Sequence, residues 1–213
     1  GNYNHSMNLK ISYAVTVCNE SEELKRLLSF LFKHKRECDE VVVQADKNKV
    51  TKEVKDVVSS FSNTTFIEHP FTGSFSEFKN HLTKQCVHDY IFQIDADEIP
   101  SIETVENLHK ILEANVDSDL FLVPRINTVE GLTKEHVDKW KWNVDDNGRV
   151  NWPDYQYRIY KNRFYIKWVN DVHEVIDGAQ VGIRLPAEDK FALTHEKTIS
   201  KQEKQNEFYE TIG

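Results

Sequence analysis

From Ile11 onwards the chain alternates between short runs of β-branched and aromatic residues and longer segments whose apolar residues recur every three or four positions. The short runs have the composition of buried strands. One of them carries three consecutive valines, as expected of a strand that is covered on both faces. The strands are expected at Ile11–Val17, Glu40–Ala45, Thr64–Glu68, Tyr90–Ile94 and Leu120–Val123.

Four segments between these strands have the apolar spacing of amphipathic helices. The first two are expected around the stripes within Leu24–Phe32 and Val50–Phe61. The third begins with Ser74 and Glu77 in S-x-x-E spacing, which is typical of a capping box, and the fourth begins at Pro100. Strands that alternate with helices form βαβ units. We therefore expect an α/β fold with a mostly parallel central sheet flanked by helices.

After Ile126 the character of the sequence changes. Thr128–Asn151 is polar and charged, and we expect an irregular insertion that could include a hairpin. A charged helix is expected at Lys197–Ile212, and the absence of repeats and linker-like stretches predicts one domain over residues 7–213. Short strands are expected at Tyr155–Lys161, Tyr165–Trp168 and Val172–Ile176.

Charge and cysteine content narrow the class of protein. A formal net charge of −8 disfavours binding of nucleic acid or an anionic membrane by bulk charge. The three cysteines are odd in number and widely spaced, which favours the reducing cytoplasm over a disulfide framework. No apolar run approaches the ~18–20 residues of a membrane span, although peripheral contact through the terminal helix stays open. Gly1–Ser6, which precede Met7, are expected to be a remnant of an expression tag.

Polar residues cluster where the expected parallel strands end, which is where open α/β sheets bind ligands. The first strand ends in T-V-C-N-E, the second in Asp46, and the fourth in D-A-D-E from Asp95 to Glu98. Neither of the common glycine-rich phosphate loops occurs. A phosphate-bearing ligand therefore needs another source of positive charge.

Asp95 and Asp97 could bind a metal ion, and the ion would supply the positive charge. Carboxylates that follow a strand can hold Mg²⁺ or Mn²⁺, whose remaining ligands come from water and substrate phosphates. The alternative is that these acids form a solvated turn or the start of a helix. Similar alternatives apply to other residues. Asn19 could cap a helix, Asp46 could be a turn residue, and His195 and the tryptophans could pack against the protein instead of contacting a ligand.

The order of several blocks resembles the family 2 glycosyltransferases of the GT-A fold. These blocks are I-S-Y-A-V-T-V-C-N-E, V-V-V-Q-A-D, S-F-S-E-F-K-N-H-L and D-Y-I-F-Q-I-D-A-D-E. The later blocks R-I-Y-K-N-R, W-V-N-D-V-H-E-V-I and L-T-H-E-K are similar to the branch that includes lipopolysaccharide-core glycosyltransferases. The resemblance implies a nucleotide-binding half at about 8–127 and an acceptor-binding and metal-completing part at about 128–213.

The resemblance also implies roles for individual residues on the donor side. Asp95 would touch the ribose, Asp97 would bind Mn²⁺ or Mg²⁺, and His195 would complete the metal site. Lys79, where the family usually has arginine, and Asn80 would lie near the diphosphate. The nucleoside would contact Thr16, Asn19, Glu20 and Asp46, although Lys47-Asn48-Lys49 after Asp46 departs from the family pattern.

On the acceptor side, the resemblance implies a general base and orienting groups. Glu174 is the expected base for a single inverting displacement, with Asp171 as the second candidate. His173, Trp168 and Arg158 are expected to orient the substrates. The implied reaction moves one sugar from a nucleotide-diphosphate donor, with UDP the expected nucleotide by analogy, to an unidentified glycan, lipid-linked or protein acceptor. A nucleotidyltransferase and a non-catalytic binding module of the same fold are the alternatives.

Overall fold

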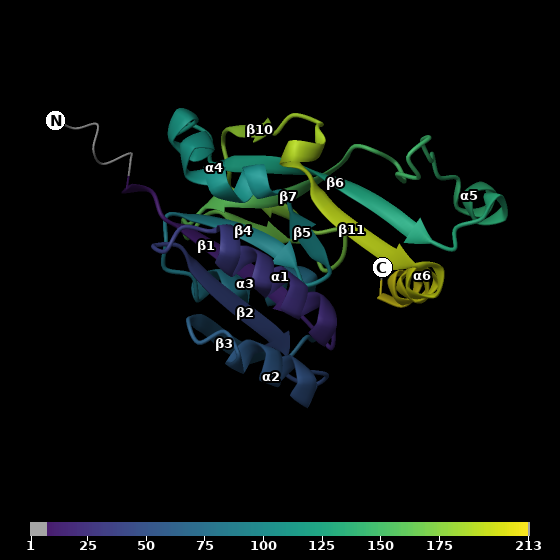
Figure 1. Cartoon of the computed structure of the whole chain (residues 1–213), viewed down its shortest axis with the longest axis horizontal. Coiled ribbons are helices and arrows are strands. Elements are labelled where there is room, and N and C mark those ends of the chain that lie inside the picture. Colours follow the sequence, from purple (N-terminus) through teal and green to yellow (C-terminus); the bar gives the residue numbers. More distant parts are fainter. Residues whose placement is uncertain (1–7, 213) are drawn as a thin grey trace.

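The computed structural model describes residues 8–212, and Figure 1 shows the chain. Residues 1–7 and 213 lie outside the described residues, and with them the predicted tag remnant Gly1–Ser6. Within the described part, eleven strands occur: β1 Ile11–Val17, β2 Glu40–Asp46, β3 Thr64–His69, β4 Tyr90–Asp95, β5 Glu98–Pro100, β6 Leu120–Glu130, β7 Asp154–Lys161, β8 Lys167–Val169, β9 Val175–Asp177, β10 Gly182–Arg184 and β11 Leu193–Thr198.

Nine of these strands form one sheet within residues 8–212, in the order β3-β2-β1-β4-β7-β6-β11-β5, with β10 paired to β6 beside this path. The pairs among β1 to β4 are parallel, and so are the pairs of β6 with β10 and β11. β7 is antiparallel to both of its neighbours, and β5 is antiparallel to β11. β8 and β9 form a separate antiparallel pair. The one sheet thus joins the first and the last thirds of the chain.

Helices cover both faces of this sheet (Figure 1). The side chains of β1 alternate between two apolar clusters, with Tyr13 facing the first and Ala14 the second. The first cluster holds the apolar faces of α1, α2 and α4, whereas the second holds Leu82 of α3. Burial on both faces explains why β1, β2 and β4 have continuous apolar sequences. The helices are α1 Ser21–His34, α2 Lys52–Ser59, α3 Phe75–Lys84, α4 Ile102–Ala114, α5 Lys134–Trp140 and α6 Ile199–Ile212, with a 3-10 turn at Asp189–Phe191.

Capping side chains start α3 and α4. Ser74 accepts the backbone N–H of Glu77 at 3.2 Å, as the S-x-x-E spacing predicts, and Ser101 accepts that of Thr104 at 3.0 Å. The N-cap of α1 is Glu20 rather than Asn19, and it makes no side-chain capping bond. The alternative that Asn19 caps this helix is therefore excluded.

The second half differs from the sequence expectation in several places. The strands expected at Tyr165–Trp168 and Val172–Ile176 are β8 Lys167–Val169 and β9 Val175–Asp177, and β10 was not expected. β6 continues to Glu130 instead of ending at Val123, and the expected irregular insertion contains α5. Val144 and Val150 pair as in a hairpin within that insertion. β11 occupies residues 193–198, so the terminal helix begins at Ile199 and not at Lys197. Polar strands such as L-T-H-E-K-T lack the apolar composition by which strands are found in a sequence.

No helix within residues 8–212 combines the length and the hydrophobicity that a bilayer crossing requires.

Candidate active site

A cleft of about 610 Å³ opens where β1, β2 and β4 end. Their last residues bring Thr16, Asp46 and Asp95 to its wall, α3 adds Lys79, and β11 adds His195. The predicted site residues that line the cleft are Thr16, Glu20, Asp46, Lys79, Asp95, Asp97, Arg158, Glu174 and His195. The predicted residues that do not line it are Asn19, Asn80, Trp168, Asp171 and His173.

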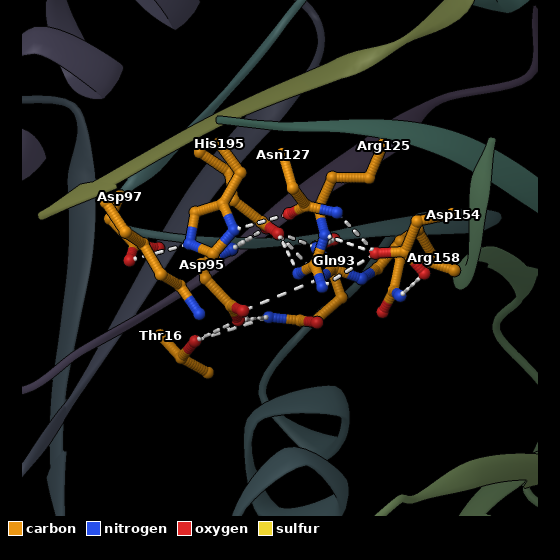
Figure 2. A network of polar contacts seen from close by, with 12 residues as sticks. Thr16, Gln93, Asp95, Asp97, Arg125, Asn127, Asp154, Arg158 and His195 are labelled. Carbon is orange, nitrogen blue, oxygen red and sulfur yellow. Dashed lines mark hydrogen bonds and ion pairs between the residues drawn. The ribbon is translucent and has the colours of Figure 1, made fainter. Parts of the chain in front are cut away.

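Asp95 is held by neighbours that keep it ionised (Figure 2). Its Oδ1 accepts the hydroxyl of Thr16 at 2.9 Å and the Gln93 amide at 3.1 Å, and its Oδ2 lies 3.5 Å from Arg158 Nη2. Burial raises the pKa of Asp95, but the charges of Arg158 and Lys79 outweigh it, so its pKa lies well below the ordinary range. Asp95 is therefore a carboxylate at any physiological pH.

Glu98, the last acid of D-A-D-E, is a buried anchor of this loop rather than a lining residue. It is 0% exposed, and its Oε1 accepts the backbone N–H of Asp95 at 2.9 Å. Arg158 Nη2 donates to its Oε2 at 2.8 Å, Arg158 Nη1 to its Oε1, and Arg125 Nη1 to its Oε2 at 2.9 Å. A buried carboxylate requires such compensation. Sequence reasoning missed this role because the two arginines lie far along the chain.

Arg158, predicted to orient the substrates, lies in the floor of the cleft, where Glu98 and Asp95 hold its guanidinium. It is 2% exposed. Trp168, also predicted to orient the substrates, is 3% exposed and packs in the second apolar cluster. Its indole N–H donates to the hydroxyl of Tyr160 at 3.1 Å. The indole of Trp168 therefore has almost no exposed face to offer an acceptor.

Asp97 and His195 form the second polar centre of the cleft. Asp97 Oδ2 lies 3.0 Å from His195 Nε2 and 3.3 Å from Lys201 Nζ. Burial raises the pKa of Asp97, but its hydrogen bond and ion pair with His195 outweigh this and lower the pKa to about 2. The pair predicted from the sequence is thus brought together, with a cation of α6 beside it.

The spacing of Asp97 and His195 suits a hard divalent cation, but the two side chains supply only part of its ligands. Two ligands in adjacent positions of an octahedron of about 2.1 Å radius lie about 3 Å apart, as these two atoms do. No group of three or more His, Cys, Asp or Glu side chains among residues 8–212 is arranged to hold a metal. The chain therefore offers two ligands, and a bound metal would need its others from water and from a ligand such as a diphosphate.

Lys79 and Glu174 meet on another wall of the cleft. Lys79 Nζ lies 3.8 Å from Glu174 Oε2 and 4.2 Å from the centre of a Trp168 ring. Burial lowers the pKa of Lys79, although the neighbouring Asp95 and Glu174 oppose that effect. Among residues 8–212, Glu174 Oε2 is buried and finds no hydrogen-bond partner. An acceptor oxygen without a donor is unusual in a folded protein, and here it belongs to a cleft residue.

Four predicted site residues instead hold the surrounding loops. Asn80 clamps the backbone of Trp168 with two hydrogen bonds of 2.8 Å each. The carbonyl of Asp171 accepts the N–H of Phe75 at 2.8 Å, and that of Asn19 accepts the N–H of Ser21 at 3.0 Å. His173 has a positive φ of 51° and stacks on Tyr209 with ring centres 5.3 Å apart.

Asp46 serves both the turn and the cleft. Its Oδ1 accepts the backbone N–H groups of Asn48 and Phe71, each at 3.1 Å, and the residue also lines the cleft. The turn and the ligand interpretations of Asp46 are thus compatible.

The terminal helix α6 contributes a wall that the sequence did not predict. Lys201, Lys204, Gln205, Phe208 and Tyr209 line the cleft from this helix. Phe208 packs near Phe71 and Phe75, at ring-centre distances of 6.3 and 6.1 Å. The acidic chain thereby acquires a cationic cleft. Among the described residues its lining has seven Lys and Arg (Lys49, Lys79, Arg125, Arg158, Lys197, Lys201, Lys204) against five Asp and Glu (Glu20, Asp46, Asp95, Asp97, Glu174).

Known structures share this architecture. Residues 1–349 of TarS from S. aureus, in complex with UDP-GlcNAc, match with a TM-score of 0.64 and 18% identity over 89% of this chain and 59% of that one. A longer TarS structure matches with a TM-score of 0.62 and 18% identity over 93% of this chain and 38% of that one. This chain thus spans about three fifths of the first. The likeness confirms the predicted α/β fold of the GT-A type.

Sequence comparison gives the family. No curated protein sequence matches the chain significantly. The family model described as Glycosyl transferase family 2 matches residues 12–183, which is most of the chain. The chain therefore belongs to glycosyl transferase family 2.

Proposed function

We propose that the chain is a metal-dependent glycosyltransferase that moves a single sugar from a nucleotide-diphosphate donor to an acceptor, with inversion of configuration. The observation that carries the proposal is the excess of cations in a cleft that also holds Asp95, Asp97 and His195, in a family 2 chain. A nucleotide diphosphate is the kind of anion that such a cleft attracts. A UDP-linked donor is the first choice, since TarS was solved with UDP-GlcNAc.

We propose that the nucleoside lies along the ends of β1 and β2, against Thr16, Glu20 and Asp46. Asn19 would shape this loop through its backbone, and Asp95 would accept a ribose hydroxyl. The diphosphate would then lie toward Lys79 and the lysines of β11 and α6, which are Lys197, Lys201 and Lys204. Asn80 and Trp168 would support Lys79 from below, because Asn80 clamps the backbone of Trp168 and Lys79 lies over its ring.

The metal of this proposal is Mg²⁺ or Mn²⁺, held by Asp97 and His195. When bound, such an ion stabilises the negative charge that gathers on a departing diphosphate. Asp97 is ionised and therefore ready to bind a cation without losing a proton. Lys201, which now lies beside Asp97, would be released to neutralise the phosphates.

Glu174 is our candidate for the general base. Its Oε2 receives no hydrogen bond from the part of the chain that the structure describes, which leaves a carboxylate oxygen available to accept the proton of an attacking hydroxyl. Asp171, the second candidate from the sequence, does not line the cleft and is less well supported. His173 would hold α6 near this wall through its stacking on Tyr209. A general base of this kind contributes roughly 10²- to 10⁴-fold to the rate.

The acceptor needs an approach of its own. A second cleft, of about 650 Å³, shares Asp97, Lys197 and Lys201 with the first, and Thr194 and Glu196 line it. We propose that the acceptor enters the region formed by residues 128–213 while residues 8–127 hold the donor, as parts of a single domain. Placement in the branch of the lipopolysaccharide-core glycosyltransferases rests on the later sequence blocks. A cytoplasmic location is supported by the free Cys18, Cys38 and Cys86.

Calorimetric titration of UDP and GDP, with Mn²⁺ and then with EDTA, tests the proposal. We expect metal-dependent binding of one nucleotide that Asp97→Ala abolishes. Asp56→Ala is the matched control, because Asp56 is an exposed acid of α2 paired with Lys52. Absence of nucleotide binding with and without metal would contradict the donor site. Binding without turnover of any nucleotide sugar would instead identify a non-catalytic module.

A further inference from the structure

Large apolar side chains are exposed together at the edge of the sheet that lies opposite the cleft. Among residues 8–212, seven large apolar side chains are exposed, and five of them lie on four loops at this edge. The five are Val87, Val116, Phe164, Tyr165 and Val181. Single exposed apolar residues are normal on a protein surface, whereas a group of them marks an interaction site.

Sheet topology places the four loops side by side. Residues 86–89 precede β4, residues 115–119 precede β6, and residues 178–181 precede β10. Residues 162–166 follow β7 instead, but β7 is antiparallel to both β4 and β6. Because β10 is parallel to β6, all four loops come to the same edge, in the strand order β4-β7-β6-β10. The cleft lies at the other end of β4.

Hydrogen bonds join each loop to the next. The side-chain amide of Asn162 donates to the carbonyl of His88 at 3.0 Å. The backbone N–H of Lys161 donates to the carbonyl of Asp119 at 3.0 Å. Asp119 Oδ1 in turn accepts the N–H of Val181 at 2.9 Å. The five apolar side chains therefore belong to one continuous surface, which we call the loop face.

The aromatic turn of the loop face is held in place. The N–H of Ile166 donates to the carbonyl of Arg163 at 3.0 Å, which closes the turn that carries Phe164 and Tyr165. Gly178 packs so tightly against this turn that a Cβ there would lie 1.8 Å from the carbonyl oxygen of Tyr165. The Phe164 side chain is nevertheless 94% exposed. A fixed backbone thus presents an aromatic ring to solvent, and a partner that covers it would bury roughly 200 Å².

The charges of the loop face favour a protein partner over an anionic membrane. Its four loops carry Arg163 against Asp89, Asp117 and Asp119, whereas anionic lipid attracts an excess of cations. Arg163 and Asp117 are both exposed, and neither has an ion-pair partner within residues 8–212. Two unpaired charges of opposite sign on one face make that face complementary to a second copy of itself.

We propose that the loop face is the interface of a two-fold symmetric dimer of this chain. In such a dimer the same patch meets itself, so Arg163 of each copy pairs with Asp117 of the other while the apolar side chains pack between them. The four loops and the adjoining strand ends supply the ~20 residues a side that a standard interface needs. Both clefts stay open, because they lie at the opposite edge, and the dimer does not depend on the proposed reaction.

Sedimentation equilibrium from about 1 to 100 µM tests the dimer, since self-association depends on concentration. We expect the wild type to approach twice the 25.0 kDa of the chain. Phe164→Asp should weaken association at least about 10-fold, because it removes an aromatic anchor and buries a charge. Ile102→Asp is the control, because Ile102 is also exposed but begins α4, outside the loop face. Both variants should stay folded, because each replaces an exposed side chain.

Charge reversal tests the choice of a second copy as the partner. Arg163→Glu and Asp117→Arg should each weaken the dimer, and the double variant should recover it, because the pair re-forms with exchanged signs. A wild type that stays monomeric up to 100 µM overturns the proposal. So does a dimer that Phe164→Asp leaves intact, or a double variant that does not recover. Sedimentation of a monomeric wild type with vesicles of phosphatidylcholine and phosphatidylglycerol would identify a membrane surface instead and also overturn it.

Discussion

Replacement of Glu98 by glutamine should destabilise the fold strongly although it changes almost no volume. Glu98 is fully buried and accepts hydrogen bonds from two arginines and from the backbone of Asp95. Removal of its charge leaves Arg158, itself 2% exposed, with Asp95 at 3.5 Å as its remaining ion-pair partner. Loss of one member of a buried pair costs about 3–5 kcal/mol. For a chain of this size that is a fall in Tm of roughly 6–20 °C.

Urea denaturation followed by circular dichroism measures this loss in the metal-free protein. Glu106→Gln is the matched control, because Glu106 is half-exposed and pairs with His34, so we expect a change within about 0.5 kcal/mol. The double variant Glu98→Leu with Arg158→Leu should lose less than the sum of the single changes, since it leaves no lone charge of that pair. A loss below about 1 kcal/mol in Glu98→Gln would refute the role of Glu98 as an anchor.

Three further predictions concern the cleft itself. Glu174→Gln should lower turnover by about 10²- to 10⁴-fold and leave nucleotide affinity intact, and equal turnover in steady-state assays would exclude it as the base. Burial lowers the pKa of Lys197 to about 8, so its charge is lost as pH rises through 8; calorimetry should find nucleotide affinity falling between pH 7 and 9, with a flatter profile in Lys197→Arg. The pKa of Asp97 is lowered to about 2, below its value in the unfolded chain, so Asp97 contributes stability above pH ~4 that is lost as pH falls toward 2. The stability difference between wild type and Asp97→Asn, measured by denaturation, should shrink across that window, and a constant difference would contradict the shift.

The sequence was most informative where strands are buried on both faces. β1, β2 and β4 end within one residue of the predicted positions, because continuous apolar runs have few alternative folds. The rule that ligands bind at the carboxyl edge then selected Thr16, Asp46, Asp95 and Asp97, which all line the cleft. Local pattern and sheet topology together are sufficient to place residues that follow a buried parallel strand.

The rest of the site depends on long-range pairing. Glu98 and Arg158 are 60 positions apart, and no local pattern indicates that two charges will be buried together. The lysines of α6 face the cleft because of how that helix lies against Phe71 and Phe75, and a helix with no strong apolar stripe gives no sign of its orientation. The resemblance implies an acceptor role for Trp168, whereas the side chain is 3% exposed, and the sequence does not separate the two because exposed and packed tryptophans look alike in it.

The alternation of β11 constrains how this part of the chain can vary among its relatives. His195 and Leu193 are buried on one face of the strand, whereas Thr194, Glu196 and Thr198 are exposed on the other. Because successive side chains point to opposite faces, deletion of a single residue between Leu193 and His195 would exchange the two sets. As far as the fold is concerned, substitutions on the outward face should therefore be tolerated much more readily than any odd-numbered change in length, although Thr194 and Glu196 on that face also line the second cleft. A sequence of this lineage with such a change would be expected to have lost its partner for Asp97.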